Sequence, residues 1–210
     1  MNPFPELSSL PSLWIRQRKE LVELAGFETR NKYSIETDDN RQIGFAAEQH
    51  KGFGGFLLRQ FLGHWRRFEI HVFDALRTPV LHAEHPFRFL FHKLTIRYPD
   101  GRVLGHIQWR FSILMKKFDI LDAQENLLYS TSSPFWRIWT FPVKRLGADH
   151  AVIRKRWSGA LKEAFLDVDQ FQVEFIERTV PQEHRLLIMM AGLFVDLMYF
   201  ENKANNSWGV

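Results

Sequence analysis

The most hydrophobic stretch of this chain, residues 186–200, limits what the chain can fold into. It reads Leu-Leu-Ile-Met-Met-Ala-Gly-Leu-Phe-Val-Asp-Leu-Met-Tyr-Phe, and nothing else in the sequence is so apolar. Just before it, Thr179 and Gln182 have the spacing of a capping box with Pro181 in the first turn, which predicts a helix that starts near Pro181. Apolar residues fall on every face of this helix, as is typical of a helix buried in lipid or inside a protein.

Length and charge distinguish these two environments. Fifteen helical residues extend over about 22 Å, less than the roughly 30 Å hydrocarbon core of a bilayer. Asp196 would add about 2.5 to 3.5 kcal/mol near the bilayer centre. We therefore expect a helix surrounded by protein and keep a transmembrane helix as the alternative. Asp196 should then lie near the C-terminal end of the helix, hydrogen-bonded or at the rim, because an unpaired buried carboxylate is too unfavourable.

Composition indicates one globular domain with a preference for anionic partners. The 210 residues are 45% hydrophobic and include 20 Phe and 7 Trp. We expect a flexible N-terminus over residues 1–12, a single domain over 13–203 and a polar tail over 204–210. A net charge of +4 and a pI near 9.4 favour phospholipid headgroups or nucleic acid. Zero cysteine excludes disulfides, thiolate metal sites and S-acylation.

Most of the chain alternates between apolar and polar residues in short segments separated by turns. Turn signals are expected at residues 38–40, 74–76, 99–101, 123–125 and 147–149. The arms before the turns are residues 32–35, 67–70, 93–96, 117–120 and 136–139, and the arms after them are 43–45, 80–82, 103–107, 127–129 and 151–153. With a final pair at 164–166 and 171–175, this pattern predicts a mainly β fold, a closed antiparallel barrel of about twelve strands. Such a barrel is too wide to be filled by its own side chains, so the C-terminal helix is expected to fill it.

The N-terminal region predicts a second helix and no targeting signal. Leu13, Trp14, Leu21 and Leu24 recur at roughly helical spacing among charged residues, before Gly26. This helix would pack on the barrel or lie on a membrane. The first residues contain no basic segment followed by a long apolar one, so a cytoplasmic location is expected.

Several motifs, in order along the chain from about residue 13 to 201, carry a family resemblance. They are GFETRNKY at 26–33, FAAE at 45–48, RFEI at 67–70, WSG at 157–159, AF at 164–165 with DVD at 167–169, and FVDLMYFE at 194–201. These motifs resemble the phospholipid scramblase family, with this chain as a bacterial-type member lacking cysteines. That family is similar to the tubby C-terminal domain and the plant LURP-one-related proteins, whose fold is a twelve-stranded barrel around a hydrophobic helix. The resemblance implies the same architecture here.

The resemblance also points to a calcium loop, which this sequence only partly retains. In scramblases the segment matching residues 167–178 is a proposed calcium site. Asp167 and Asp169 match it, but Gln172 replaces a glycine and Arg178 replaces the terminal acid. Calcium is normally enclosed by oxygen ligands, and an arginine supplies a cation instead. We expect Asp167 and Asp169 to cap a turn, keep calcium as the alternative, and expect no other cofactor.

Aromatic residues occupy the loops where family members carry cysteine clusters. Rings interleaved with arginine suit a membrane interface, so we expect a membrane-facing rim. The alternative is that these rings plug the barrel ends or pack on the N-terminal helix. The candidate rim residues are Phe53, Phe56, Phe61, Trp65, Phe89, Phe91, Phe135 and Trp136.

Basic clusters on the expected strands are candidates for binding a lipid headgroup or phosphoinositide, as the resemblance to tubby domains implies. Strand alternation would put Lys155 on the opposite face from its two arginine neighbours. The alternative is that these cations solvate strand edges and deter aggregation. The candidates are Arg66, Arg67, Lys116, Lys117, Lys144, Arg145, Arg154 and Arg156.

The sequence shows no arrangement typical of catalysis, so we do not expect an enzyme. The nine histidines are scattered, and His82 and His85 lie in a strand-to-loop passage that does not favour metal ligation. The function expected is peripheral binding of anionic phospholipid or phosphoinositide membranes at the inner membrane face, with promotion of lipid movement between leaflets as a further step. The alternatives are a tubby-like regulatory module for nucleic acid or a protein partner, and a barrel that holds an acyl chain. The oligomeric state is not predicted.

Overall fold

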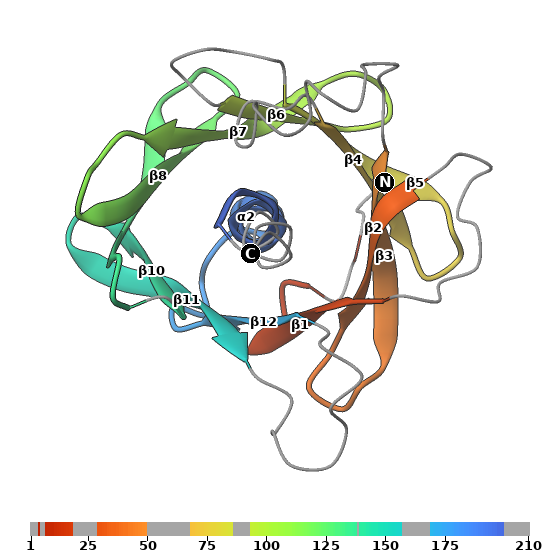
Figure 1. The fold of residues 1–210 in the computed structure, drawn as a ribbon. Helices are drawn as coiled ribbons and strands as arrows, with labels where there is room; N and C mark the ends of the chain where they lie inside the picture. The colour runs from red at the N-terminus through yellow and green to blue at the C-terminus, as the bar shows by residue number, and fades with distance from the viewer. Residues whose placement is uncertain are drawn as a thin grey trace, which may run out of the picture.

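The computed structural model describes residues 4, 7–18, 29–49, 68–85, 93–137, 139–156 and 169–199. Twelve strands form a closed barrel around one helix (Figure 1). The elements are β1 (Ser12–Gln17), β2 (Thr29–Glu36), β3 (Gln42–Gln49), β4 (Phe68–Asp74), β5 (Pro79–His85), β6 (Lys93–Arg97), β7 (Val103–Arg110), β8 (Met115–Asp122), β9 (Leu127–Pro134), β10 (Thr140–Arg145), β11 (Ala148–Arg156), β12 (Gln170–Phe175) and α2 (Gln182–Tyr199). The predicted barrel is confirmed.

The barrel closes at β1, which pairs antiparallel with β12 on one side and β2 on the other. The expected helix starting at Leu13 is wrong for this segment. Leu13 and Ile15 are fully buried while Trp14 and Arg16 face outward, the two-residue alternation of a strand. The strand that completes the set of twelve is therefore β1, at the N-terminal end of the chain. The strand predicted at 164–166 and residues 19–28 of the expected helix lie outside the described residues. The strand predicted at 136–139 is placed too early, because β10 begins at Thr140.

Acidic side chains build the tight turns between paired strands. Asp74 Oδ1 accepts hydrogen bonds from the backbone N–H groups of Leu76 and Thr78 at 2.9 and 2.8 Å. Asp122 Oδ1 does the same for residues 124 and 126. Each turn also has a residue in the left-handed region, such as Gly101 with φ of 86°, followed or preceded by a register shift in the ladder. Four of the turns have the geometry of a type I turn with a bulge, whereas Leu146 and Gly147, both at positive φ, form a two-residue type I′ turn between β10 and β11.

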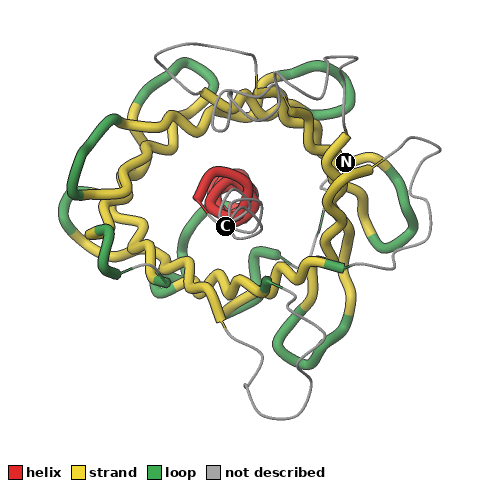
Figure 2. The backbone as a smooth tube through the Cα atoms, in the orientation of Figure 1, coloured by secondary structure: helices red, strands yellow, loops and turns green. Residues whose placement is uncertain are grey.

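Helix α2 runs through the middle of the barrel (Figure 2). Its residues 185–198 are all buried, so the expected protein-surrounded helix is confirmed. The helix begins with the Arg185 N–H donating to Pro181 O at 3.0 Å. This agrees with the helix start predicted near Pro181, and Thr179 donates locally from its N–H and hydroxyl to Glu177 Oε1 at 3.0 and 2.8 Å. Within the described residues, no helix combines the length and apolarity that a membrane crossing requires.

Two residues of α2 show how closely it fits the barrel. Asp196 is 2% exposed and accepts a hydrogen bond from the Tyr33 hydroxyl at 2.7 Å, as expected for a buried carboxylate near the helix C-terminus. Gly192 lies against β1 and β12, where a Cβ would come within 2.7 Å of Ile15 Cδ1 and 3.3 Å of Val173 Cγ2. A larger residue at Gly192 would therefore push the helix away from this wall.

Arg185 seals the end of the barrel where α2 begins. Its side chain is buried, and its guanidinium donates to the backbone carbonyls of Leu7 at 3.1 Å, Leu10 at 2.7 Å, Arg178 at 2.9 Å and Val180 at 3.1 Å. The guanidinium also lies 4.3 Å from the ring centroid of Phe175. Burial lowers the pKa of Arg185, and the surrounding carbonyls stabilise its charge. Arg185, a residue of α2, thus contacts the N-terminal segment, β12 and the segment between β12 and α2.

The barrel has two different ends. The turns after β2, β4, β6, β8 and β10 and the start of α2 lie at one end, which we call the turn end. The connections after β1, β3, β5, β7, β9 and β11 leave from the other end, where α2 finishes; we call it the loop end. Tyr98 and Glu183 meet at the turn end, and Tyr199 stacks on Phe141 at the loop end with ring centroids 5.8 Å apart.

Candidate functional site at the loop end

Large apolar side chains are exposed on two neighbouring connections of the loop end. The first connection joins β7 to β8, and the second follows β9. The Phe135 N–H donates to Leu114 O at 3.1 Å, so the two connections lie side by side. The exposed residues, with their exposed fractions, are Phe111 (77%), Ile113 (83%), Leu114 (59%), Phe135 (53%) and Trp136 (64%). We call these five residues the apolar rim.

Local contacts fix the shape of the second connection without covering its rings. The Arg137 N–H donates to Pro134 O at 2.9 Å, which closes a turn with Phe135 and Trp136 at its tip. Ser133 Oγ lies 2.9 Å from Arg137 O and 2.6 Å from Thr140 O, so its hydroxyl can donate to either. The two tip rings pack edge to face with centroids 5.1 Å apart. Contiguous exposed apolar surface of this kind marks an interaction site more often than a chance feature.

Sequence reasoning found only part of this rim. Phe135 and Trp136 were expected to be there, and the structure places both at the loop end, on the surface. Phe111, Ile113 and Leu114 were missed. The signal was present, because residues 111–114 join two strands without the Gly, Pro, Asn or Asp that a connection usually contains. The other candidates, Phe53, Phe56, Phe61, Trp65, Phe89 and Phe91, lie outside the described residues.

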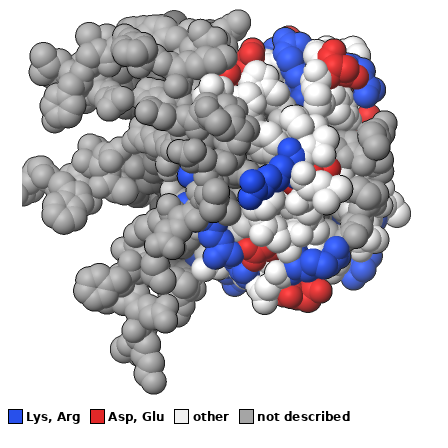
Figure 3. Space-filling model, turned by 90° about the vertical axis from the view of Figure 1, so that its right-hand side faces the viewer, with Lys and Arg blue, Asp and Glu red and all other residues white. Residues whose placement is uncertain are grey.

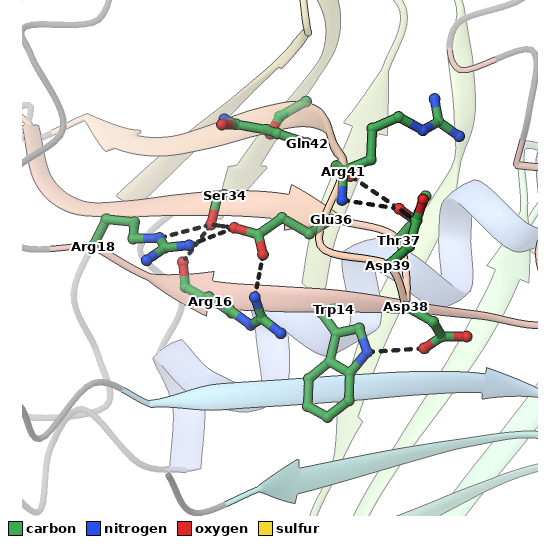
Figure 4. Close-up of polar contacts among 11 residues, drawn as sticks. Trp14, Arg16, Arg18, Ser34, Glu36, Thr37, Asp38, Asp39, Arg41 and Gln42 are labelled. Atoms are coloured by element: carbon green, nitrogen blue, oxygen red, sulfur yellow. Dashed lines mark hydrogen bonds and ion pairs between the residues drawn. The ribbon is translucent and has the colours of Figure 1, made fainter.

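An arginine cluster lies on the outer face of β1 and β2, with its acids Glu36 and Asp38 at and just after the end of β2 (Figure 4). Arg16 and Arg18 both form ion pairs with Glu36, the second at 2.5 Å, and the Ser34 hydroxyl donates to the same carboxylate at 2.6 Å. Trp14 donates from Nε1 to Asp38 at 2.9 Å. Glu36 and Asp38 together balance the charges of Arg16 and Arg18, and the Arg18 side chain is 43% exposed.

Strand β11, separated from β1 by β12, adds two more arginines to the outer surface of the barrel. Arg154 and Arg156 of β11 point outward, Arg154 in an ion pair with Glu174 and Arg156 in a hydrogen bond with Gln172 at 2.8 Å. Lys155 points to the interior, where Nζ lies 2.5 Å from Asp169. The expected alternation of these three residues therefore holds. The structure adds Arg16 and Arg18, which sequence reasoning had assigned to a helix.

The remaining predicted headgroup residues are dispersed. Lys117 lies on the outer face of β8 near the loop end, whereas Lys116 points inward with Nζ 5.6 and 5.3 Å from the ring centroids of Phe141 and Tyr199. Lys144 and Arg145 lie at the turn end, where Lys144 pairs with Asp149 at 3.5 Å. A single site cannot include both groups. Arg66 and Arg67 lie outside the described residues.

Of the two candidate calcium ligands, Asp167 and Asp169, the structure describes only Asp169. Asp169 faces the Lys155 ammonium group, which already neutralises its charge. Asp167 lies outside the described residues. Ligation of calcium by Asp169 would need the carboxylate to leave this lysine.

Glu36 organises the arginine cluster, and its removal is expected to destabilise the fold. Burial alone would raise the pKa of Glu36, but the Ser34 hydrogen bond and the two arginines bring it below the ordinary 4.5. We expect Glu36→Gln to lower the free energy of unfolding at pH 7 by about 1–2 kcal/mol, because Gln cannot neutralise Arg16 and Arg18.

The pH dependence checks the cause. A lowered pKa in the folded state stabilises the fold above pH 4.5, and this contribution is lost as the pH falls through the lowered value. Urea unfolding of wild type and Glu36→Gln should therefore differ at pH 7 and converge in acid. A difference that persists unchanged at pH 3 would mean that packing, and not charge, explains the loss.

The structure is a closed barrel around a buried helix, with large apolar side chains exposed on two connections of its loop end. Residues 3–202 match the family model described as Scramblase. The chain therefore belongs to the scramblase family, and the expected family is confirmed.

Individual relatives agree with this assignment. Phospholipid scramblase 2 of Bos taurus is 29% identical over 93% of this chain and 70% of its own length. Phospholipid scramblase 1 of Homo sapiens is 28% identical over 93% of this chain and 65% of its own length. The chain thus spans about two thirds of the length of these relatives. An X-ray structure of a protein from Arabidopsis thaliana aligns over 98% of this chain with a TM-score of 0.46 and 10% identity.

Proposed function

We propose that this protein binds anionic phospholipid membranes peripherally, with its loop end against the bilayer surface. Relatives are named phospholipid scramblases, which supports a function connected with phospholipid. The observation that carries the proposal is the apolar rim, with five large side chains exposed on two adjoining connections. Side chains of this kind are expected at a membrane interface, where rings enter the headgroup region and nearby cations meet phosphates.

The energies are sufficient for reversible binding. Burying one large apolar side chain contributes about 1.5–3 kcal/mol, and each cation near an anionic surface adds about 1 kcal/mol. Partial burial of the rim, together with the more exposed Arg18 and Arg156, therefore offsets the loss of translational freedom that a peripheral protein undergoes. Attachment through the loop end needs no helix to enter the bilayer.

The two connections that carry the apolar rim differ from the tight turns in their acids. Each of the five tight turns has an aspartate in it or beside it, such as Asp38, Asp74, Asp100, Asp122 and Asp149. The connections 111–114 and 135–137 contain none. The rim therefore brings no carboxylate close to lipid phosphates, whereas each tight turn would bring at least one, offset in part by cations such as Arg41, Arg77 and Arg102.

Nucleic acid is the rival partner, and the face that carries β2–β5 favours it less. Figure 3 shows the side of the barrel that carries β2–β5, where Lys and Arg side chains alternate with Asp and Glu among uncharged residues. A nucleic-acid binder typically presents a basic stripe. Movement of lipid between leaflets would need a polar path for the headgroup, and the apolar side chains of α2 fill the described interior. The proposal is therefore confined to surface binding.

Vesicle co-sedimentation with increasing fractions of phosphatidylserine tests the proposal. Wild type should bind more as the anionic fraction rises, and Ile113→Ser/Trp136→Ser should bind about 30- to 100-fold more weakly, since partial burial of these two side chains contributes about 2–3 kcal/mol in total. Leu76→Ser/Leu146→Ser, which changes two exposed leucines at the turn end, is the matched control and should bind like wild type. Equal loss in both variants, or binding to DNA with a steep salt dependence and none to vesicles, would contradict the proposal.

A further inference from the structure

Two pairs of polar residues face each other on the outer surface of β4 and β5. In the ladder between these strands, His71 lies opposite His82 and Glu69 lies opposite Glu84. Residues two apart on a strand share a face, so these four side chains form the corners of a small square. Their neighbours Ile70 and Ala83 are fully buried on the inner face.

Three of these side chains bring potential metal-binding atoms together. His82 Nε2 lies 3.4 Å from Glu69 Oε2, and His71 Nε2 lies 3.9 Å from the same oxygen. The ligand atoms of all three residues lie within 4.8 Å of one another. We propose that Glu69, His71 and His82 bind a divalent transition-metal ion, with Zn²⁺ as the best fit.

The distances agree with a tetrahedral zinc site. Zinc binds imidazole nitrogen and carboxylate oxygen at about 2.0–2.2 Å, so neighbouring ligand atoms in a tetrahedron lie roughly 3.3–3.5 Å apart. The distance from Glu69 to His82 already has this value, and that to His71 is about half an ångström longer. The imidazole rings are stacked with centroids 4.5 Å apart and planes 23° apart. A rotation about χ2, which is soft in histidine, would direct both Nε2 atoms to one point.

The present hydrogen bond of His71 does not oppose this arrangement. Its Nε2 atom lies 2.9 Å from Gln49 Oε1 on the adjoining strand β3. A neutral amide at the surface can turn away when a metal replaces it. Glu84, whose side chain is 46% exposed and whose Oε1 lies 3.8 Å from His82 Nδ1, or a water molecule would complete the coordination.

The donor set selects the class of metal. Two imidazoles and a carboxylate suit zinc and related transition metals, whereas calcium and magnesium prefer oxygen ligands throughout. Glu69 is 1% exposed, so a bound cation would also neutralise a carboxylate held away from water. His85, the other histidine of β5, is on the inner face and stacks on Phe68, which keeps it out of this cluster.

The place of the site suggests what the metal does. β4 begins and β5 ends at the loop end, and Glu69 is the second residue of β4. A metal held by both strands would fasten them together at the end that we propose to meet the membrane. Its role is therefore structural, and its test does not depend on lipid binding.

Isothermal titration of Zn²⁺ into untagged, chelator-treated full-length protein tests the site. Wild type should bind one equivalent, and Co²⁺ should give the absorption of a tetrahedral complex. His71→Gln/His82→Gln should lower the Zn²⁺ affinity at least 10- to 100-fold, by the usual effect of removing ligands. His150→Gln, which changes a histidine on β11 outside the cluster, is the matched control and should leave the affinity unchanged.

Thermal unfolding followed by circular dichroism distinguishes a lost site from a lost fold. Zinc should raise the melting temperature of wild type and His150→Gln, but not of the double variant. If the double variant does not fold, His71→Gln alone must show the weaker binding. Zinc binding by the double variant as tight as in wild type, or no stoichiometric binding by wild type, would overturn the proposal.

Discussion

Arg185→Leu is expected to lower the free energy of unfolding by about 3–5 kcal/mol. The substitution removes a buried guanidinium that donates to four backbone carbonyls from the N-terminal segment and the approach to α2. Leucine fills part of the volume but leaves those carbonyls without their donor, and the bonds to Leu7 and Val180 are buried. It also removes the cation from the face of Phe175.

Urea unfolding at neutral pH gives this value, and two further variants identify its cause. Arg185→Lys keeps the charge but loses the planar fork, so an intermediate loss is expected. Arg145→Leu changes an exposed arginine at the same end of the barrel and should shift the stability by less than about 0.5 kcal/mol. If Arg185→Leu were within 1 kcal/mol of wild type by the same measure, the turn end would not be sealed by this side chain.

Phe194→Ala is expected to lower the free energy of unfolding by about 3–5 kcal/mol. Phe194 is fully buried on α2 and meets Phe118 of β8 edge to face, with ring centroids 5.7 Å apart. Because the helix fills a closed barrel, the strands cannot move inward to fill the space left by the ring, so most of the cavity should remain.

Chemical unfolding of Leu127→Ala provides the comparison. Leu127 is 61% exposed on β9, so its truncation should change the stability by about 0.5 kcal/mol or less. A loss below about 1.5 kcal/mol for Phe194→Ala would indicate that the helix packs loosely inside the barrel.

The sequence predicted the parts of the fold that depend on local pattern. Hairpins such as the one around Gly101 were evident, because alternation and turn residues lie within a few positions of each other. β1 was not evident, because Leu13, Trp14 and the charged residues after them fit a helix as well as a strand over so short a span. What decides the matter is pairing with β12, where Ile15 lies opposite Phe171, and a contact this distant in the chain leaves no local signal.

The candidate site also combines residues that local sequence predicts with residues whose setting depends on strand pairing. Phe135 and Trp136 could be predicted from the density of aromatic residues around them, whereas Arg16 and Arg18 acquire their setting only when β1 pairs with β2 and brings Glu36 beside them. The histidine cluster depends on register as well. The sequence directs attention to His82 and His85, but three residues along a strand put them on opposite faces, and the partner of His82 is His71 of the neighbouring strand.

The claim that the loop end meets the membrane can be measured directly, because the chain has no cysteine and a single introduced one can be labelled selectively. Ile113→Cys, carrying a polarity-sensitive fluorophore, should shift to shorter emission wavelength and resist an aqueous quencher when anionic vesicles are added. Leu146→Cys, labelled in the same way at the turn end, should remain in water. A shift at Leu146→Cys with none at Ile113→Cys would contradict the proposed orientation, and no shift at either position would contradict contact between the apolar rim and the membrane.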